Sequence, residues 1–129
     1  MQIMPINSSN LPKIKTPAEA LTKELGEAKD RAYMKAYKNM LLPKGQQQFP
    51  GKLRHNMTIL NLCESLHLEG CSIMKKLAEG LNPELKKQAE DRLQHITNIL
   101  KQELSKLDIN KEVLEKGLKD MLSKISKVH

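Results

Sequence analysis

One apolar stripe, between Asn82 and Leu107, constrains the fold of this chain more than any other feature. Asn82 suits the N-cap of a helix, and Pro83 and Glu84 suit its first turn. Apolar residues then recur at steps of three and four: Leu85, Ala89, Leu93, Ile96, Leu100, Leu104 and Leu107. This spacing places them on one side of a helix of about seven turns at 3.6 residues per turn. Such a stripe must leave water, so we expect the rest of the chain to pack against it.

Three further segments repeat this helical period. Residues 16–19 carry the signals of a helix start: a capping threonine, a proline and a glutamate that completes a capping box. The helix that follows is expected to end at Pro43. Its expected buried face consists of Leu21, Leu25, Ala28, Ala32, Ala36 and Met40. A second apolar set predicts a helix over 52–68, a break at Gly70 and a short helix over 72–79. The last helix begins after Asn110, and its short connection predicts an antiparallel hairpin with the preceding helix.

These segments predict a single all-α domain over residues 16–129, a helical bundle of four longer helices and one short helix. The linker at 43–51 contains two prolines and two glycines, which exclude a continuous helix, and we expect Phe49 to pin it to the core. Residues 1–15 have no acidic residue and no sustained period, so they are predicted to form a flexible, disordered tail. With two Tyr, one Phe and no Trp, the chain is also poor in residues that favour strands.

Cys63, His67 and Cys71 form the most specific candidate for chemistry. Their i, i+4, i+8 spacing would place two thiols and an imidazole on one side of a helix. Zinc uses such ligands but needs them to converge tetrahedrally, and one helix usually supplies only two. We therefore interpret the cysteines as reduced core residues and the histidine as a residue at the rim of the core, with zinc binding left open. The chain has no phosphate-binding loop and no hydrolase or metalloprotease motif, so we expect no enzyme, cofactor or metal.

The net positive charge of the chain permits several kinds of partner. A net charge of +7 allows attraction to nucleic acid, an anionic membrane or an acidic protein. Residues 59–77, ILNLCESLHLEGCSIMKKL, resemble the helix-turn-helix of bacterial regulators, although His67 stands where that motif has a turn glycine. The resemblance places Ser72, Lys75 and Lys76 on the exposed side of a recognition helix. A small basic DNA-binding regulator is therefore the alternative function.

A partner-binding surface is the favoured interpretation. The expected helix up to Leu42 has a broad apolar and aromatic face that includes Tyr33, Met34, Tyr37 and Met40. Met-rich faces with tyrosine adapt well to partner helices, so these four residues are our candidate contacts with another protein. Against this, most of the face is expected to pack on the bundle itself, which would leave only part of it for a partner. The long stripe at 85–107 is also compatible with a homo-oligomer.

The start of the chain bears on where the protein acts. It lacks the charged start and apolar core of a secretory signal, and no apolar run reaches a membrane-spanning length. Its uncharged composition of Ser, Asn, Ile and Pro resembles the N-terminal region of bacterial type III secreted effectors. That resemblance implies a virulence effector or secretion-system accessory that is exported by a non-Sec route. The ordinary alternative is a cytoplasmic protein. We thus predict a non-enzymatic helical protein that works by binding another protein.

Overall fold

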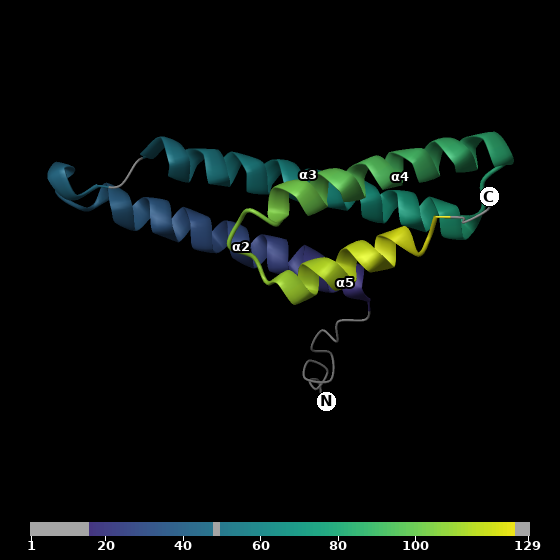
Figure 1. Cartoon of the computed structure of the whole chain (residues 1–129), viewed down its shortest axis with the longest axis horizontal. Helices are drawn as coiled ribbons and strands as arrows, with labels where there is room; N and C mark the ends of the chain where they lie inside the picture. The colour runs from purple at the N-terminus through teal and green to yellow at the C-terminus, as the bar shows by residue number, and fades with distance from the viewer. Residues whose placement is uncertain (1–15, 48–49, 126–129) are drawn as a thin grey trace, which may run out of the picture.

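The computed structural model describes residues 16–47 and 50–125, and this part of the chain is helical (Figure 1). Its elements are α2 (Pro17–Met40), the 3-10 turn η1 (Lys44–Gln46), α3 (Pro50–Glu79), α4 (Pro83–Leu104) and α5 (Lys111–Leu122). The described residues contain no strand, and the all-α helical bundle is confirmed. The predicted tail at 1–15 and Phe49 lie outside the described residues.

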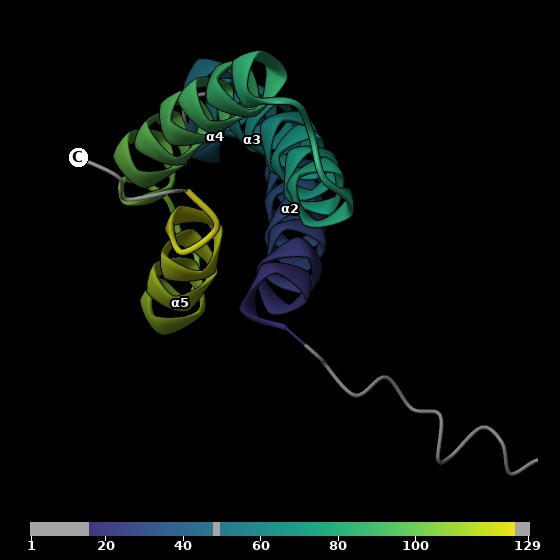
Figure 2. The ribbon, with the colours of Figure 1, turned by 90° about the vertical axis from the view of Figure 1, so that its right-hand side faces the viewer.

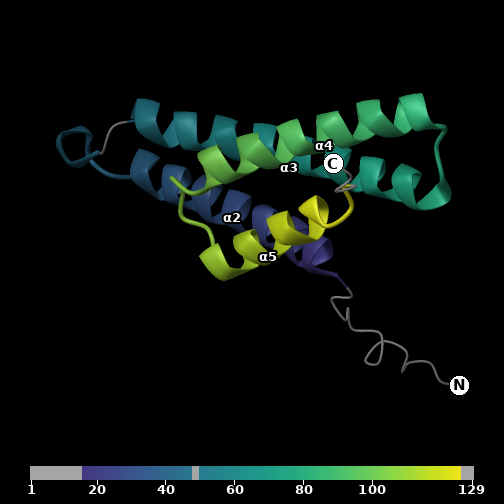
Figure 3. The same ribbon diagram turned by 45° about the vertical axis from the view of Figure 1, so that its right-hand side comes forward.

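The four helices are arranged around a shared core (Figure 2). α2 packs on α3 and α5, and α4 packs on the same two helices from the opposite corner. Ion pairs fix two of these contacts, Lys29–Glu64 between α2 and α3 at 2.7 Å and Arg92–Glu69 between α3 and α4 at 2.6 Å. The second half of α2 and the first part of α3, joined through η1, extend beyond α4 and α5 as a two-helix hairpin (Figures 1 and 3). We call the described residues 31–47 and 50–63 of this segment the projecting hairpin, whose innermost residues, including Leu60 and Cys63, are buried in the shared core.

Three of the predicted helix starts are confirmed, whereas α3 begins at Pro50, so Pro50 and Gly51 belong to a helix and not to the linker expected at 43–51. The Thr16 hydroxyl accepts a hydrogen bond from the Glu19 N–H at 3.1 Å, and the Glu19 carboxylate accepts one from the Thr16 N–H at 3.2 Å. The Asn82 side chain accepts a hydrogen bond from the Leu85 N–H at 2.9 Å, which caps α4. Asn110 caps α5 in the same way. Each cap satisfies backbone donors that the first turn of a helix leaves unpaired, so the sequence signals set these boundaries.

The expected apolar stripe of α4 supplies the centre of the core. Leu93, Ile96, Leu100 and Leu104 are fully buried, as are Leu21 and Met121 from the other helices. Two expectations at helix ends are wrong, because Leu85 and Met40 are both exposed. Both residues lie near helix ends, where the apolar period continues but the described helices leave these side chains exposed.

Gly70 does not break the third segment. α3 runs without interruption from Pro50 to Glu79, so the expected break and the separate short helix at 72–79 are wrong. Gly70 is buried where α3 meets α4 and α5, and a Cβ atom there would collide with Cε of Met121. The missing side chain thus permits close packing and does not mark a turn. α3 ends instead before Gly80, whose φ of 101° is the left-handed conformation that favours glycine after a helix.

Candidate partner-binding surface

The four predicted contact residues lie together on one side of α2 and face solvent. Tyr33 is 48% exposed, Met34 53%, Tyr37 58% and Met40 72%. Leu41, at the end of the helix, continues the same side at 68% exposure. We call these five residues the α2 stripe. The expectation that most of this face packs on the bundle is therefore wrong.

The stripe is exposed because α2 has two apolar sides in its second half. Ala28 is buried and Ala32 packs against the core from the side of α2 that faces α3. The positions of the stripe fall on the other side of the helix, where a shift of one residue turns the side chain by about 100°. Since α4 and α5 do not extend along the outer part of the projecting hairpin (Figure 3), none of the described helices covers this second side. The arrangement leaves a continuous apolar surface at the spacing that a partner helix would contact.

The alternative DNA-binding residues are exposed, but they are not part of a helix-turn-helix. Ser72, Lys75 and Lys76 lie on the outside of α3 near its end. Residues 59–77 form one uninterrupted helix, so the turn that the motif requires is absent from this segment. The predicted helix-turn-helix at 59–77 is therefore wrong as local structure. Gly70, which was expected to break the helix, allows close helix packing instead.

His67 lies inside the core, not at its rim as predicted. Its Nε2 is 2.9 Å from the carbonyl oxygen of Ala18 and 3.0 Å from Oγ1 of Thr22, both on α2. A carbonyl oxygen only accepts, so Nε2 carries the proton that it donates to Ala18, and in the neutral ring Nδ1 is then unprotonated. Nδ1 is buried and has no hydrogen-bond partner among the described residues. Burial lowers the pKa of His67, which the bond to Ala18 only partly offsets. The neutral imidazole thus joins α3 to the first turns of α2.

The surroundings of the two cysteines beside this histidine disfavour the thiolate form. Burial raises the pKa of the Cys63 thiol to about 11, with a smaller contribution from Glu103. Burial also raises the pKa of Cys71, whose Sγ lies 3.6 Å from the His67 Nε2. Metal binding and nucleophilic attack both require the thiolate, which a raised pKa disfavours. Within the described ranges, no three His, Cys, Asp or Glu side chains are placed to hold a metal ion.

A shallow groove of about 800 Å³ lies between α4 and α5. Leu118 and Leu122 contribute its apolar part, and Thr97 and Asn98 contribute polar groups from α4. Lysines and glutamates are mixed along its edge, and Glu112 and Lys116 pair with each other at 3.3 Å. The groove therefore presents no concentrated charge of one sign.

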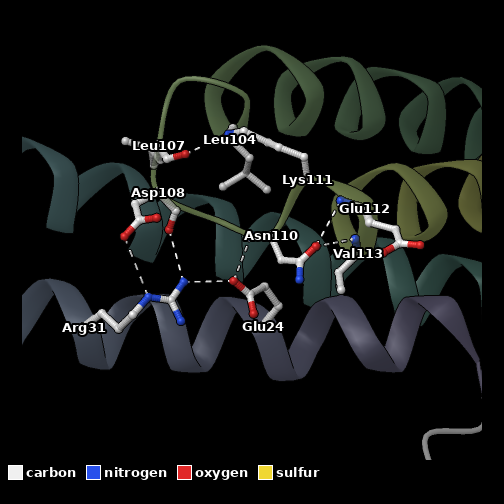
Figure 4. A network of polar contacts seen from close by, with 9 residues as sticks. All are labelled: Glu24, Arg31, Leu104, Leu107, Asp108, Asn110, Lys111, Glu112 and Val113. Carbon is white, nitrogen blue, oxygen red and sulfur yellow. Dashed lines mark hydrogen bonds and ion pairs between the residues drawn. The ribbon is translucent and has the colours of Figure 1, made fainter.

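A polar network that no local sequence pattern indicates fixes the α4–α5 connection to α2 (Figure 4). One carboxylate oxygen of Glu24 accepts hydrogen bonds from Arg31 Nη2 and from the Asn110 N–H, both at 2.9 Å. Arg31 Nη2 also donates to the carbonyl oxygen of Asp108 at 3.1 Å. The Lys111 ammonium donates to three carbonyl oxygens at the end of α4. The network thus holds the bundle together beside the base of the projecting hairpin.

Glu24→Gln is expected to lower the free energy of unfolding by about 1–2 kcal/mol, because it weakens two charge-assisted hydrogen bonds of a largely buried side chain. Urea unfolding followed by circular dichroism measures this change. The matched control is Glu27→Gln, one turn further along α2, whose exposed side chain makes only a 4.0 Å pair with Lys23. That control should change stability by less than about 0.5 kcal/mol. Equal effects of the two substitutions would show that the network does not stabilise the bundle.

The fold and the surface define an all-α bundle with an exposed apolar stripe on a projecting hairpin. In comparisons with protein families, curated proteins and solved structures, no match to this chain was found. None of the described helices is both long enough and apolar enough to cross a membrane.

Proposed function

We propose that this protein is a non-enzymatic helical bundle that binds another protein through the α2 stripe. The observation that carries the proposal is the exposure of Tyr33, Met34, Tyr37 and Met40 on one side of a single helix. Tyrosine can bury a large area while its hydroxyl stays hydrated, and methionine adapts its shape to the partner. Exposed apolar side chains that form a contiguous patch are typical of interaction sites, whereas single ones are ordinary on any surface.

The spacing of the stripe favours a helical partner. Tyr33, Tyr37 and Met40 follow each other at i, i+4 and i+7, the positions that anchor a helix lying along another helix. The partner helix would pack on the side of α2 opposite α3 and so add a third helix to the projecting hairpin. The large aromatic side chains would carry most of the binding energy, as is usual at helical interfaces.

The N-terminal composition supports a more specific setting for the same activity. Its resemblance to type III secreted effectors favours an effector or an accessory of a bacterial secretion system that acts by contact with a partner protein. In that setting the protein would leave the cytoplasm by a non-Sec route. An oligomer of the chain is a further form of the same proposal, with a second copy as the partner.

The double substitution Tyr33→Ala/Tyr37→Ala is expected to weaken partner binding at least tenfold, because it removes both aromatic anchors. Affinity capture from the native cell, with quantitative mass spectrometry, measures which proteins bind the original chain and are lost with the variant. Light scattering tests whether the partner is a second copy. Both tyrosines are exposed, so the free energy of unfolding should change by less than about 0.5 kcal/mol each.

Leu85→Ala is the matched control, since Leu85 is equally exposed but lies on α4, away from the stripe. It should leave partner binding unchanged. If the folded tyrosine variant captures the same proteins to the same extent as the original chain, the assignment of the surface is wrong.

A further inference from the structure

The projecting hairpin carries a strong excess of positive charge in addition to its apolar stripe. Residues 31–63 include six Lys or Arg residues and no Asp or Glu, whereas the chain as a whole has 22 basic and 15 acidic residues. Arg31 is paired with Glu24 at the base of the hairpin. The other five cations are exposed and form no ion pair with any described residue: Lys35, Lys38, Lys44, Lys52 and Arg54. Their charge is therefore not neutralised within the described protein.

Apolar side chains are exposed where the hairpin turns. Met40, Leu41 and Leu42 follow each other at the end of α2, and all three are exposed. Met40 ends α2, and Leu41 and Leu42 lead from it toward η1. We call Met40, Leu41 and Leu42 the hairpin tip. The end of α2 lies near one extremity of the molecule, beyond the reach of α4 and α5, and η1 is the outermost element there (Figures 1 and 3).

We propose that the hairpin tip binds the surface of a lipid bilayer that contains anionic phospholipids. A bilayer offers an apolar interior beneath a plane of negative headgroups. The turn of the hairpin combines both features, with exposed aliphatic side chains at the end of α2 and exposed cations around them: Lys38 on α2, Lys44 in η1 and Lys52 on α3.

The tyrosines lie close enough to the hairpin tip to reach the lipid headgroups when the tip contacts the bilayer. Tyr37 lies one turn from the tip along α2, and Tyr33 lies two turns from it. In the sequence, Lys35 lies between the two tyrosines and Lys38 directly follows Tyr37. Tyrosine side chains prefer the headgroup region, and lysine side chains reach toward phosphate with their aliphatic part in the apolar layer. The binding is peripheral, because the hairpin would enter only the interface of the bilayer. Each lysine or arginine near an anionic surface strengthens binding by about fivefold.

Vesicle co-sedimentation tests the proposal with vesicles of phosphatidylcholine alone and with about one-third phosphatidylserine. The protein should bind the mixed vesicles and not phosphatidylcholine alone, and added salt should weaken that binding. Leu41→Ser/Leu42→Ser should reduce binding about tenfold through lost apolar burial. Lys44→Glu/Lys52→Glu should reduce it by more than tenfold, since two attractive charges become repulsive.

The matched controls make the same kinds of substitution on other surfaces of the protein. Leu68→Ser removes an exposed leucine from the middle of α3, and Lys86→Glu/Lys119→Glu makes the same change in net charge on α4 and α5. Both controls should bind the mixed vesicles nearly as well as the original chain. If the charge control weakens binding as much as Lys44→Glu/Lys52→Glu, the attraction reflects net charge alone and the site assignment is wrong.

Intrinsic fluorescence reports directly on depth. The chain has two tyrosines and no tryptophan, and both tyrosines lie on the α2 stripe next to the tip. Lipids brominated near the headgroup should quench this fluorescence when the protein binds mixed vesicles. Binding without quenching would overturn the proposed orientation, and absence of binding would overturn the proposal.

Absence of vesicle binding leaves the proposed protein-binding function intact, because that function is tested by Tyr33→Ala/Tyr37→Ala in affinity capture. If vesicles do not bind but Lys44→Glu/Lys52→Glu abolishes capture of the protein partner, the hairpin tip serves an acidic protein. That result would replace the lipid with a protein ligand.

Discussion

Gly117→Ala is expected to lower the free energy of unfolding by about 2 kcal/mol, although alanine favours helices more than glycine does. A Cβ atom at this position of α5 would lie 2.7 Å from Cδ2 and 2.9 Å from Cβ of Leu21. Leu21 is fully buried, and its Cβ atom cannot move without the backbone of α2. The two helices must therefore separate, which loses contacts across a close-packed interface.

Gly26→Ala is the matched control for this substitution. Gly26 is also a helical glycine, but a Cβ atom there would have no neighbour within 4 Å. This substitution should raise the free energy of unfolding by about 1 kcal/mol, through helix propensity alone. Urea unfolding of both variants measures the two changes, whose opposite signs are the essential result. If Gly117→Ala stabilises the protein as Gly26→Ala does, the close approach of α2 and α5 is wrong.

Acid is expected to destabilise the bundle through His67. Burial lowers the pKa of this histidine in the folded state, so the unfolded chain takes up the proton first as the pH falls. The contribution of His67 is fully present above the unfolded pKa of about 6.5 and is lost as the pH falls toward the folded pKa. The free energy of unfolding then decreases by up to about 1.4 kcal/mol per pH unit. The physical cause is Nδ1, where the added proton would lie buried without an acceptor.

Urea unfolding between pH 7.5 and pH 5 measures this dependence, from about one unit above to about 1.5 units below the ordinary histidine pKa. In His67→Gln a neutral amide can donate to the Ala18 carbonyl, so the slope near pH 6 should be lost. The charged groups beside this region are Glu19 on α2, Lys75 on α3, Asp120 on α5 and Lys124 just after α5. They remain in the variant, and His55→Gln, on the exposed side of α3, should keep the slope. An unchanged slope in His67→Gln would contradict the assignment.

Local signals in the sequence predicted the helix boundaries well where those boundaries depend on neighbouring residues. The caps at Thr16, Asn82 and Asn110 act within one turn, so their residue types suffice to place three helix starts. Gly70 shows the limit of such signals. A glycine in an apolar helix favours either a break or a close approach, and only the positions of Leu93, Ile96 and Met121 in space decide between them.

The exposure of the candidate contact residues could not be predicted from the sequence. Periodicity shows that Tyr33 and Tyr37 share a side of α2, but not whether another helix covers that side. Likewise, the spacing of His67 and the cysteines predicts that they share a helix face, but it does not predict how deeply the histidine side chain is buried. The bond between Glu24 and the Asn110 N–H joins residues 86 positions apart, for which no local pattern exists.

The projecting hairpin has a consequence for how the protein opens. Its two helices have neighbours on fewer sides than the four-helix part, so less apolar area opposes their separation. Amide hydrogen exchange in the hairpin should therefore occur by local unfolding. The free energy of this opening should be well below the one that protects α4 around Leu100. The outer turns of α2 and α3 would form a separate cooperative unit that fluctuates while the rest remains native. Any ligand that occupies this unit would slow its exchange first, which gives a residue-level assay for binding before the ligand has been identified.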